Sequence, residues 1–146
     1  LLETDDEGII ASTVNELVDD RGNPAEGFAD ATDESEGAFD RTKPSIDYAH
    51  LSTNNSWNQS WALEGNIGRI QANTSEDLLS SSCTFNGNVT TLNWYNAQEF
   101  DVVYTFSNSD TEGILVFELT FIDSAGNQGD TVITSTNNSY IIFVFI

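Results

Sequence analysis

The sequence predicts an all-β fold, an antiparallel β-sandwich of about seven strands. Apolar and polar residues alternate with a period of two over residues 100–107 and 115–122, which is the pattern of strands with one buried face. Turn-forming residues recur about every ten residues, as they do in all-β sandwiches. No stretch of the chain has the apolar spacing of an amphipathic helix. A two-sheet architecture is therefore expected.

The candidate strands follow one another through the second part of the chain. We expect strands at residues 46–51, 66–73, 82–85, 89–95, 100–106 and 115–121, and a long, kinked last strand over 132–136 and 140–145. Asn86-Gly87 predicts a hairpin turn between the third and fourth strands, because both residue types tolerate the positive φ angles of this turn. Alternate residues of two strands should point into the core: Phe100, Val102, Tyr104, Phe106, Leu115, Phe117, Leu119 and Phe121.

The chain contains an internal repeat. Residues 5–10 read DDEGII and residues 110–115 read DTEGIL, at an offset of 105. Further along, Gly22 corresponds to Gly126 and Phe39 to Phe143 at an offset of 104, so one inserted residue before Gly22 explains the change. A period near 105 residues is the size of one sandwich domain. Residues 1–40 are therefore interpreted as the last strands of one copy, and residues 41–146 as a complete copy.

Five motifs follow one another along the chain: Asp40-Arg41-Thr42-Lys43-Pro44, Glu64-Gly65-Asn66, Thr74-Ser75-Glu76, Asp110-Thr111-Glu112-Gly113 and Asp123-Ser124-Ala125-Gly126-Asn127. In this order they resemble the immunoglobulin-like repeats of giant bacterial surface and adhesin proteins. The resemblance covers 41–146 throughout, and 5–40 as the end of a preceding copy. It implies an immunoglobulin-like sandwich, an extracellular or cell-surface location, and a structural or adhesive role. Val144 stands where the first copy has Asp40, so no second linker is visible.

Composition argues against several classes of function. Asp and Glu outnumber Lys and Arg 24 to 4, for a net charge of −20, which disfavours nucleic acid and anionic membrane surfaces as partners. No apolar run approaches the roughly 20 residues of a membrane helix, so membrane insertion is not expected. His50 is the only histidine, and no nucleophile elbow, phosphate-binding loop or Cys/His ligand set occurs. Cys83, the only cysteine, is interpreted as a small half-buried apolar residue or as an intermolecular bridge. We therefore expect no enzymatic activity.

Three acidic positions are expected to meet where the two copies join, namely Asp40, Glu76 and Asp123. The first strand of a sandwich starts at this junction, and the second and penultimate strands end there. Oxygen ligands from separate loops suit Ca²⁺, which takes about 6–8 of them. Neighbouring acids would add ligands: Asp6, Glu7 and Asp77. The alternative is that these residues cap turns and form a solvated acidic surface, and both interpretations stay open.

Two tryptophans lie in a polar segment that precedes the second strand. Trp57 and Trp61 are surrounded by Asn, Ser and Gln, so exposed indoles there would stack on sugar rings of cell-surface glycans. The alternative is a tryptophan lid over the edge of the sandwich. Five asparagines begin Asn-x-Ser/Thr sequences, which are glycan acceptors in a eukaryotic secreted protein and otherwise chance matches: Asn54, Asn58, Asn73, Asn88 and Asn137.

Two functions follow from these patterns. The first is a non-catalytic extracellular spacer, adhesive module or filament-building unit whose partners are adjacent repeats or other copies of the chain. The second is a carbohydrate-binding module that uses Trp57 and Trp61. Residues 1–40 are expected either to be disordered or to exchange strands with another copy, because strands without their partners leave edges unpaired.

Overall fold

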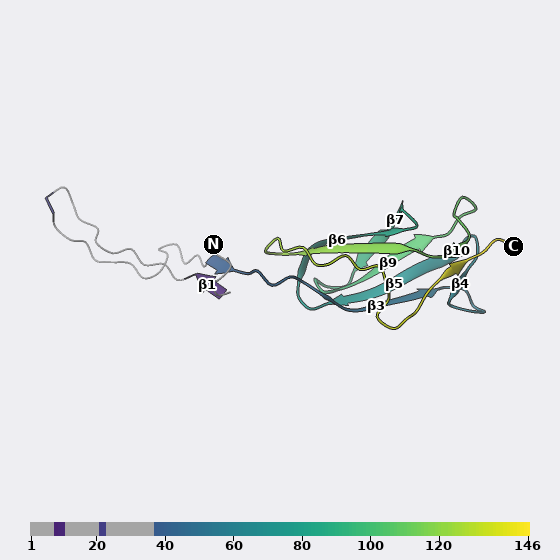
Figure 1. The fold of residues 1–146 in the computed structure, drawn as a ribbon, viewed down its shortest axis with the longest axis horizontal. Coiled ribbons are helices and arrows are strands. Elements are labelled where there is room, and N and C mark those ends of the chain that lie inside the picture. Colours follow the sequence, from purple (N-terminus) through teal and green to yellow (C-terminus); the bar gives the residue numbers. More distant parts are fainter. Residues whose placement is uncertain (1–7, 11–20, 23–36) are drawn as a thin grey trace. The chain divides into compact units, whose positions relative to one another are not determined.

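The computed structural model describes residues 8–10, 21–22 and 37–146. The chain divides into two compact units, Leu1–Arg41 and Thr42–Ile146. In the first unit, β1 (Gly8–Ile10) pairs antiparallel with β2 (Gly37–Phe39). Across the described ranges the chain forms strands, turns and bends but no helix, which confirms the all-β prediction (Figure 1). None of these residues therefore belongs to a helix able to cross a membrane.

The second unit, described without gaps, contains ten strands. Five of them have seven or eight residues: β3 (Ile46–Thr53), β5 (Ile67–Thr74), β6 (Leu78–Phe85), β9 (Glu99–Thr105) and β11 (Phe117–Asp123). The other five are short: β4 (Trp61–Ala62), β7 (Asn88–Val89), β8 (Thr91–Trp94), β10 (Gly113–Ile114) and β12 (Ile142–Phe143). The number exceeds the predicted seven because the segment predicted over 89–95 is divided into β7 and β8, and because β4 and β10 lie where no strand was predicted.

These strands form three sheets around one core. The order β3-β5-β9-β8 makes a four-stranded antiparallel sheet, and β11-β6-β7 makes a three-stranded antiparallel sheet. The third sheet, β10-β12-β4, lies toward the C-terminal end of the unit, and its β12–β4 pair is parallel (Figure 1). Buried side chains from all three sheets belong to a single apolar cluster.

The alternating pattern places its apolar residues as expected. Of the eight side chains predicted to point inward, only Tyr104 is more than marginally exposed. Its hydroxyl donates to Asp110 Oδ1 at 2.7 Å, so one end of the ring meets a polar partner while the rest packs against the core. Phe143, on β12, extends this core by stacking on Phe106, with ring centroids 5.0 Å apart. The predicted core of these two strands is confirmed.

The predicted hairpin at Asn86-Gly87 is also confirmed. Phe85 pairs with Asn88, which leaves a two-residue loop between β6 and β7. Asn86 has φ = 48° and Gly87 has φ = 81°, the positive values that such a loop needs.

The long last strand predicted over 132–145 is wrong. Only β12 and a single bridge between Leu119 and Val132 take part in strand pairing. Between them, side chains bind the edge of β3: Thr136 Oγ1 accepts from the Ala49 N–H at 3.1 Å, and Ser139 Oγ accepts from the Leu51 N–H at 2.7 Å. Because hydroxyl groups satisfy this edge, the segment does not need to continue as a ladder strand.

The internal repeat is visible in backbone pairing and conformation. Gly8 pairs with Phe39 in the first unit, and Gly113 pairs with Phe143 in the second, at the offsets found in the sequence. Both glycines have the same unusual backbone, with φ of 131° and 127°. Gly22 and Gly126, also equivalent, have φ of 80° and 93°. Most of residues 1–40 lies outside the described ranges, so the prediction of disorder or strand exchange there stays a prediction.

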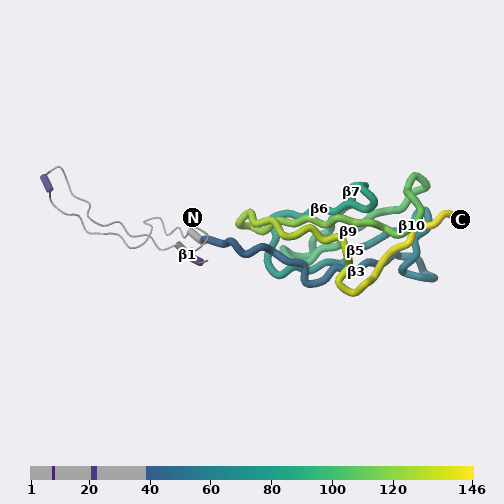
Figure 2. The backbone as a smooth tube through the Cα atoms, viewed as in Figure 1, coloured from purple at the N-terminus to yellow at the C-terminus, as the bar shows by residue number. Residues whose placement is uncertain are grey.

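The chain enters the second unit at one end, and its last strand lies at the opposite end. Ile46, at the start of β3, pairs with Thr74, whereas Ile142 pairs with Trp61, beyond the far end of β3. The eight residues of β3 span roughly 25 Å. Figure 2 shows the incoming segment at one end of the unit and the C-terminal residue at the opposite end.

Candidate functional site

Two predicted acidic loops lie at the end where the chain begins the second unit. β5 ends at Thr74 beside Ile46, and β11 ends at Asp123 beside Leu78. A carboxylate oxygen of Glu76 and one of Asp123 lie within 4.8 Å of each other. Two oxygens bound to one Ca²⁺ at 2.3–2.6 Å are at most about 5 Å apart, so this pair fits a divalent cation.

The other predicted metal ligands are placed differently. Asp77 is exposed, and its Oδ1 accepts from Gln98 Nε2 at 2.9 Å. Asp40 belongs to the first unit, so its contribution to the site stays a prediction. Asp6 and Glu7 lie outside the described residues. Within the second unit, two carboxylates therefore supply fewer oxygens than Ca²⁺ takes, and water or further protein oxygens would have to complete the set.

Asp123 caps the turn that follows β11, as the alternative interpretation predicted. Only 1% of its surface is exposed. Its Oδ1 accepts from the backbone N–H groups of Ala125 (2.9 Å) and Asn127 (2.8 Å), and its Oδ2 accepts from Asn127 Nδ2 (2.9 Å). Burial alone would raise the pKa of Asp123, but hydrogen bonds from the Asn127 side chain and from backbone N–H groups outweigh it and hold this pKa below the ordinary 3.8.

Trp57 and Trp61 line one groove at the opposite end of the unit. Trp57 is 95% exposed and covers little of the unit, whereas Trp61 is 42% exposed, so the alternative of a lid stays open for Trp61. The groove has a volume of about 400 Å³. Its lining consists of Asn55, Trp57, Asn58, Trp61, Leu63, Val144, Phe145 and Ile146. The contribution of the last three residues follows from β12 lying beside β4.

The five asparagines of the candidate glycosylation sequences differ in their hydrogen bonds. The amide nitrogen, to which a glycan would be attached, donates to Glu99 from Asn73 and to Asp110 from Asn88. The other three use their amide oxygens as backbone acceptors, and these are Asn54, Asn58 and Asn137. Glycosylation stays a prediction at all five positions, with these last three as the better-suited acceptors.

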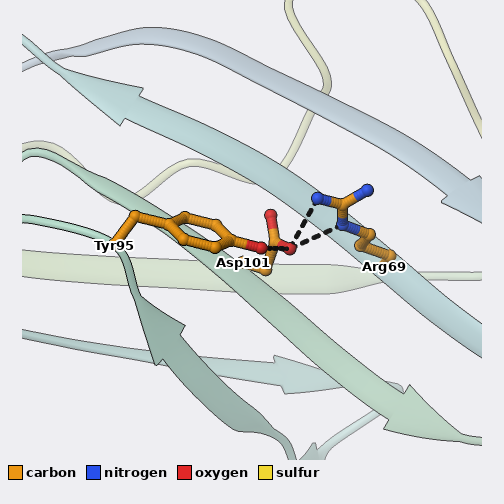
Figure 3. A network of polar contacts seen from close by, with 3 residues as sticks. All are labelled: Arg69, Tyr95 and Asp101. Carbon is orange, nitrogen blue, oxygen red and sulfur yellow. Dashed lines mark hydrogen bonds and ion pairs between the residues drawn. The ribbon is translucent and has the colours of Figure 1, made fainter.

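A polar network on the four-stranded sheet was not predicted. Asp101, on β9, is only 5% exposed although the alternating pattern placed it on the outer face. Its Oδ2 accepts from Arg69 Nε (2.7 Å) and from the Tyr95 hydroxyl (2.5 Å), and forms an ion pair with the second guanidinium nitrogen at 2.6 Å (Figure 3). Arg69 is the only Lys or Arg after Lys43, which is the one signal in the sequence that could have suggested a buried acidic partner.

The network holds both partners of the carboxylate in place. The hydrogen bond to Asp101 raises the pKa of Arg69 and also that of Tyr95. No donor among the described residues reaches the other carboxylate oxygen of Asp101, Oδ1, which is buried. Since Tyr95 follows the edge strand β8, the contacts in Figure 3 tie this edge to the centre of the sheet.

Replacing Asp101 with alanine is expected to lower the free energy of unfolding by about 2 kcal/mol. Removing one member of a buried ion pair costs about 3–5 kcal/mol, and the 40% exposure of the Arg69 side chain reduces this value by solvent screening. Urea denaturation would measure the change. Asp47→Ala, at an exposed acid on β3, is the control and should change little. Equal effects of the two substitutions would contradict a stabilising role for the network.

Cys83 and His50 lie on β6 and β3 of the second unit. Cys83 is buried in the core, and desolvation raises the pKa of its thiol to about 12. A buried thiol of this kind does not suit the predicted intermolecular bridge. His50 is half-buried on β3, with its ring 4.9 Å from that of Tyr48.

Comparisons of the chain with known families, with curated proteins and with solved structures found no match.

Proposed function

We propose that this chain is a piece of a non-catalytic, extracellular string of immunoglobulin-like sandwiches that serves as a structural spacer or filament-building unit of a surface protein. The observation that carries the proposal is the path of the chain through the second unit, from one end to the opposite end (Figure 2). A unit of this kind extends a string by its own length each time it is repeated.

The internal repeat supports the same proposal. The strand pair Gly8–Phe39 and the pair Gly113–Phe143 have the same register, which supports the interpretation of the first unit as the end of one copy and of the second unit as a further copy. Only six residues separate the end of β2 from the start of β3, and Pro44 among them restricts the preceding residue to extended conformations. A short linker of this composition favours an extended arrangement over a freely coiling one.

The charge and the acidic loops fit an extracellular surface. A net charge of −20 keeps neighbouring strings soluble and apart. Bound calcium would neutralise the Glu76–Asp123 pair, which lies at the end where the unit receives the chain. Calcium at this position stays a prediction, and its effect on the melting temperature is considered below.

Small-angle X-ray scattering on tandem copies tests the spacer function. Residues 40–146 would be joined in two and in four copies through the Asp40–Pro44 segment. The radius of gyration of an extended string roughly doubles from two to four copies, whereas that of a compact cluster rises only about 1.3-fold. We expect the larger ratio. A ratio near 1.3 would rule out an extended spacer.

A further inference from the structure

We propose that the groove between Trp57, Trp61 and Phe145, here called the tip groove, binds a neutral carbohydrate chain. This function goes beyond that of a spacer, because it supplies a ligand site at the end of the unit opposite the incoming linker. The proposal rests on three observations: how Trp57 is held, which residues surround it, and how this copy of the repeat differs from the other.

Trp57 is displayed on an ordered, hydrogen-bonded loop. Asn55 Oδ1 accepts from the N–H groups of Trp57 (2.9 Å) and Asn58 (3.3 Å), and Thr53 Oγ1 donates to the Trp61 carbonyl at 2.7 Å. Leaving an indole 95% exposed forgoes the stabilisation that its burial would give. A hydrogen-bonded loop that nevertheless presents the indole outward has the arrangement of a preorganised aromatic binding surface.

The surroundings of the two indoles are uncharged. Between Asp47 and Glu64 the sequence has no Asp, Glu, Lys or Arg, although the chain has 24 acids. The lining of the tip groove is likewise apolar apart from the amides of Asn55 and Asn58. The lining side chains carry no charge, although Glu112 accepts from the Phe145 N–H beside them. Such a surface matches a sugar, which presents apolar C–H groups on its ring faces and hydroxyl groups at its edges.

One wall of the tip groove differs in sequence between the two copies of the repeat. Val144 and Phe145 occupy the positions of Asp40 and Arg41 in the first copy, which belong to the linker. Phe145 contacts Phe143 edge to face, with ring centroids 5.2 Å apart, and its N–H donates to Glu112. Apolar residues that are anchored in this way form one wall of the groove, where the first copy has a charged connector.

Intrinsic fluorescence of the full chain tests the proposal. The probes are neutral hexasaccharides of glucose (β1,4 and α1,4), mannose and N-acetylglucosamine, together with an anionic heparin hexasaccharide. The Trp94→Phe variant restricts the signal to Trp57 and Trp61. We expect a saturable emission shift with at least one neutral probe and none with heparin. Trp57→Ala should weaken that binding about tenfold or more.

Two controls sharpen the result. Val89→Ala changes an apolar side chain that is also highly exposed but lies on β7, and it should leave the dissociation constant unchanged. Sedimentation of the native chain should give a monomer mass that Trp57→Ala does not alter. The proposal is overturned if no neutral probe binds, if Trp57→Ala binds as tightly as the native chain, or if heparin binds at least as well. A native dimer that Trp57→Ala dissociates would instead assign the groove to a second copy of the chain.

Discussion

Replacing Phe143 with alanine is expected to lower the free energy of unfolding by about 4 kcal/mol. The ring is fully buried, stacks on Phe106 and lies on β12, which joins β10 to β4. Its removal loses transfer free energy and leaves a cavity that neighbouring strands cannot fill without moving. Chemical denaturation followed by circular dichroism would measure the change.

The matched control is Phe145→Ala, two residues along the chain. Phe145 is 46% exposed, so its removal opens no enclosed cavity and should cost about 1 kcal/mol. The contrast tests whether β12 is an integral part of the core. Similar losses for the two variants would mean that β12 is only loosely attached to the rest of the second unit.

Replacing Asp123 with alanine is expected to lower the free energy of unfolding by about 3 kcal/mol, because three partly buried N–H donors lose a charged acceptor. Asp123→Asn is the matched variant. It keeps a side-chain oxygen for the two backbone donors but opposes a second amide to Asn127 Nδ2, so its loss should be smaller. Equal losses would contradict the capping role.

The pH dependence of this effect has a definite sign. Since the pKa of Asp123 is lowered in the folded state, the stabilisation is present above the pKa of the unfolded state and is lost as the pH falls through the folded pKa. The native chain should therefore lose stability below about pH 4. Asp123→Asn should be less sensitive to acid over the same range.

Calcium binding is tested with Asp123→Asn and a second variant, Glu76→Gln. If Glu76 and Asp123 hold Ca²⁺, millimolar calcium raises the melting temperature of the native chain, and Glu76→Gln and Asp123→Asn each reduce that rise. A melting curve that neither calcium nor a chelator moves would contradict the calcium prediction. Asp123 would then act in the turn alone.

Local chemistry decided which parts of the fold could be predicted. The Asn86-Gly87 hairpin depends on two residues and their φ angles, so the sequence alone was sufficient. The alternation over 100–106 likewise reports directly on which side chains face the core. The path after Val132 depends on hydroxyl groups that bind the distant edge of β3, and no pattern within that segment reveals such contacts.

The candidate sites divide in the same way. The polar Asn- and Ser-rich segment around it indicated the exposure of Trp57, but the wall supplied by Phe145 depends on the parallel pairing of β12 with β4. The alternating pattern assigned Asp101 to the outer face of its strand. Such a pattern shows only the face on which a residue lies, and it does not show whether other side chains cover that residue there. The burial of Asp101 follows from contacts with Arg69, on β5, and with Tyr95, in the segment that follows β8.

The opposite placement of the two ends of the second unit also has a mechanical consequence. Tension applied through the chain would act along β3 at one end and along β12 at the other. The hydrogen bonds between β3 and β5, and between β12 and β4, would then be loaded together in shear, instead of being opened one after another as in a zipper. Resistance to pulling depends on the rate of unfolding under load. We therefore expect the second unit to resist unfolding when it is pulled along the line that joins its two ends.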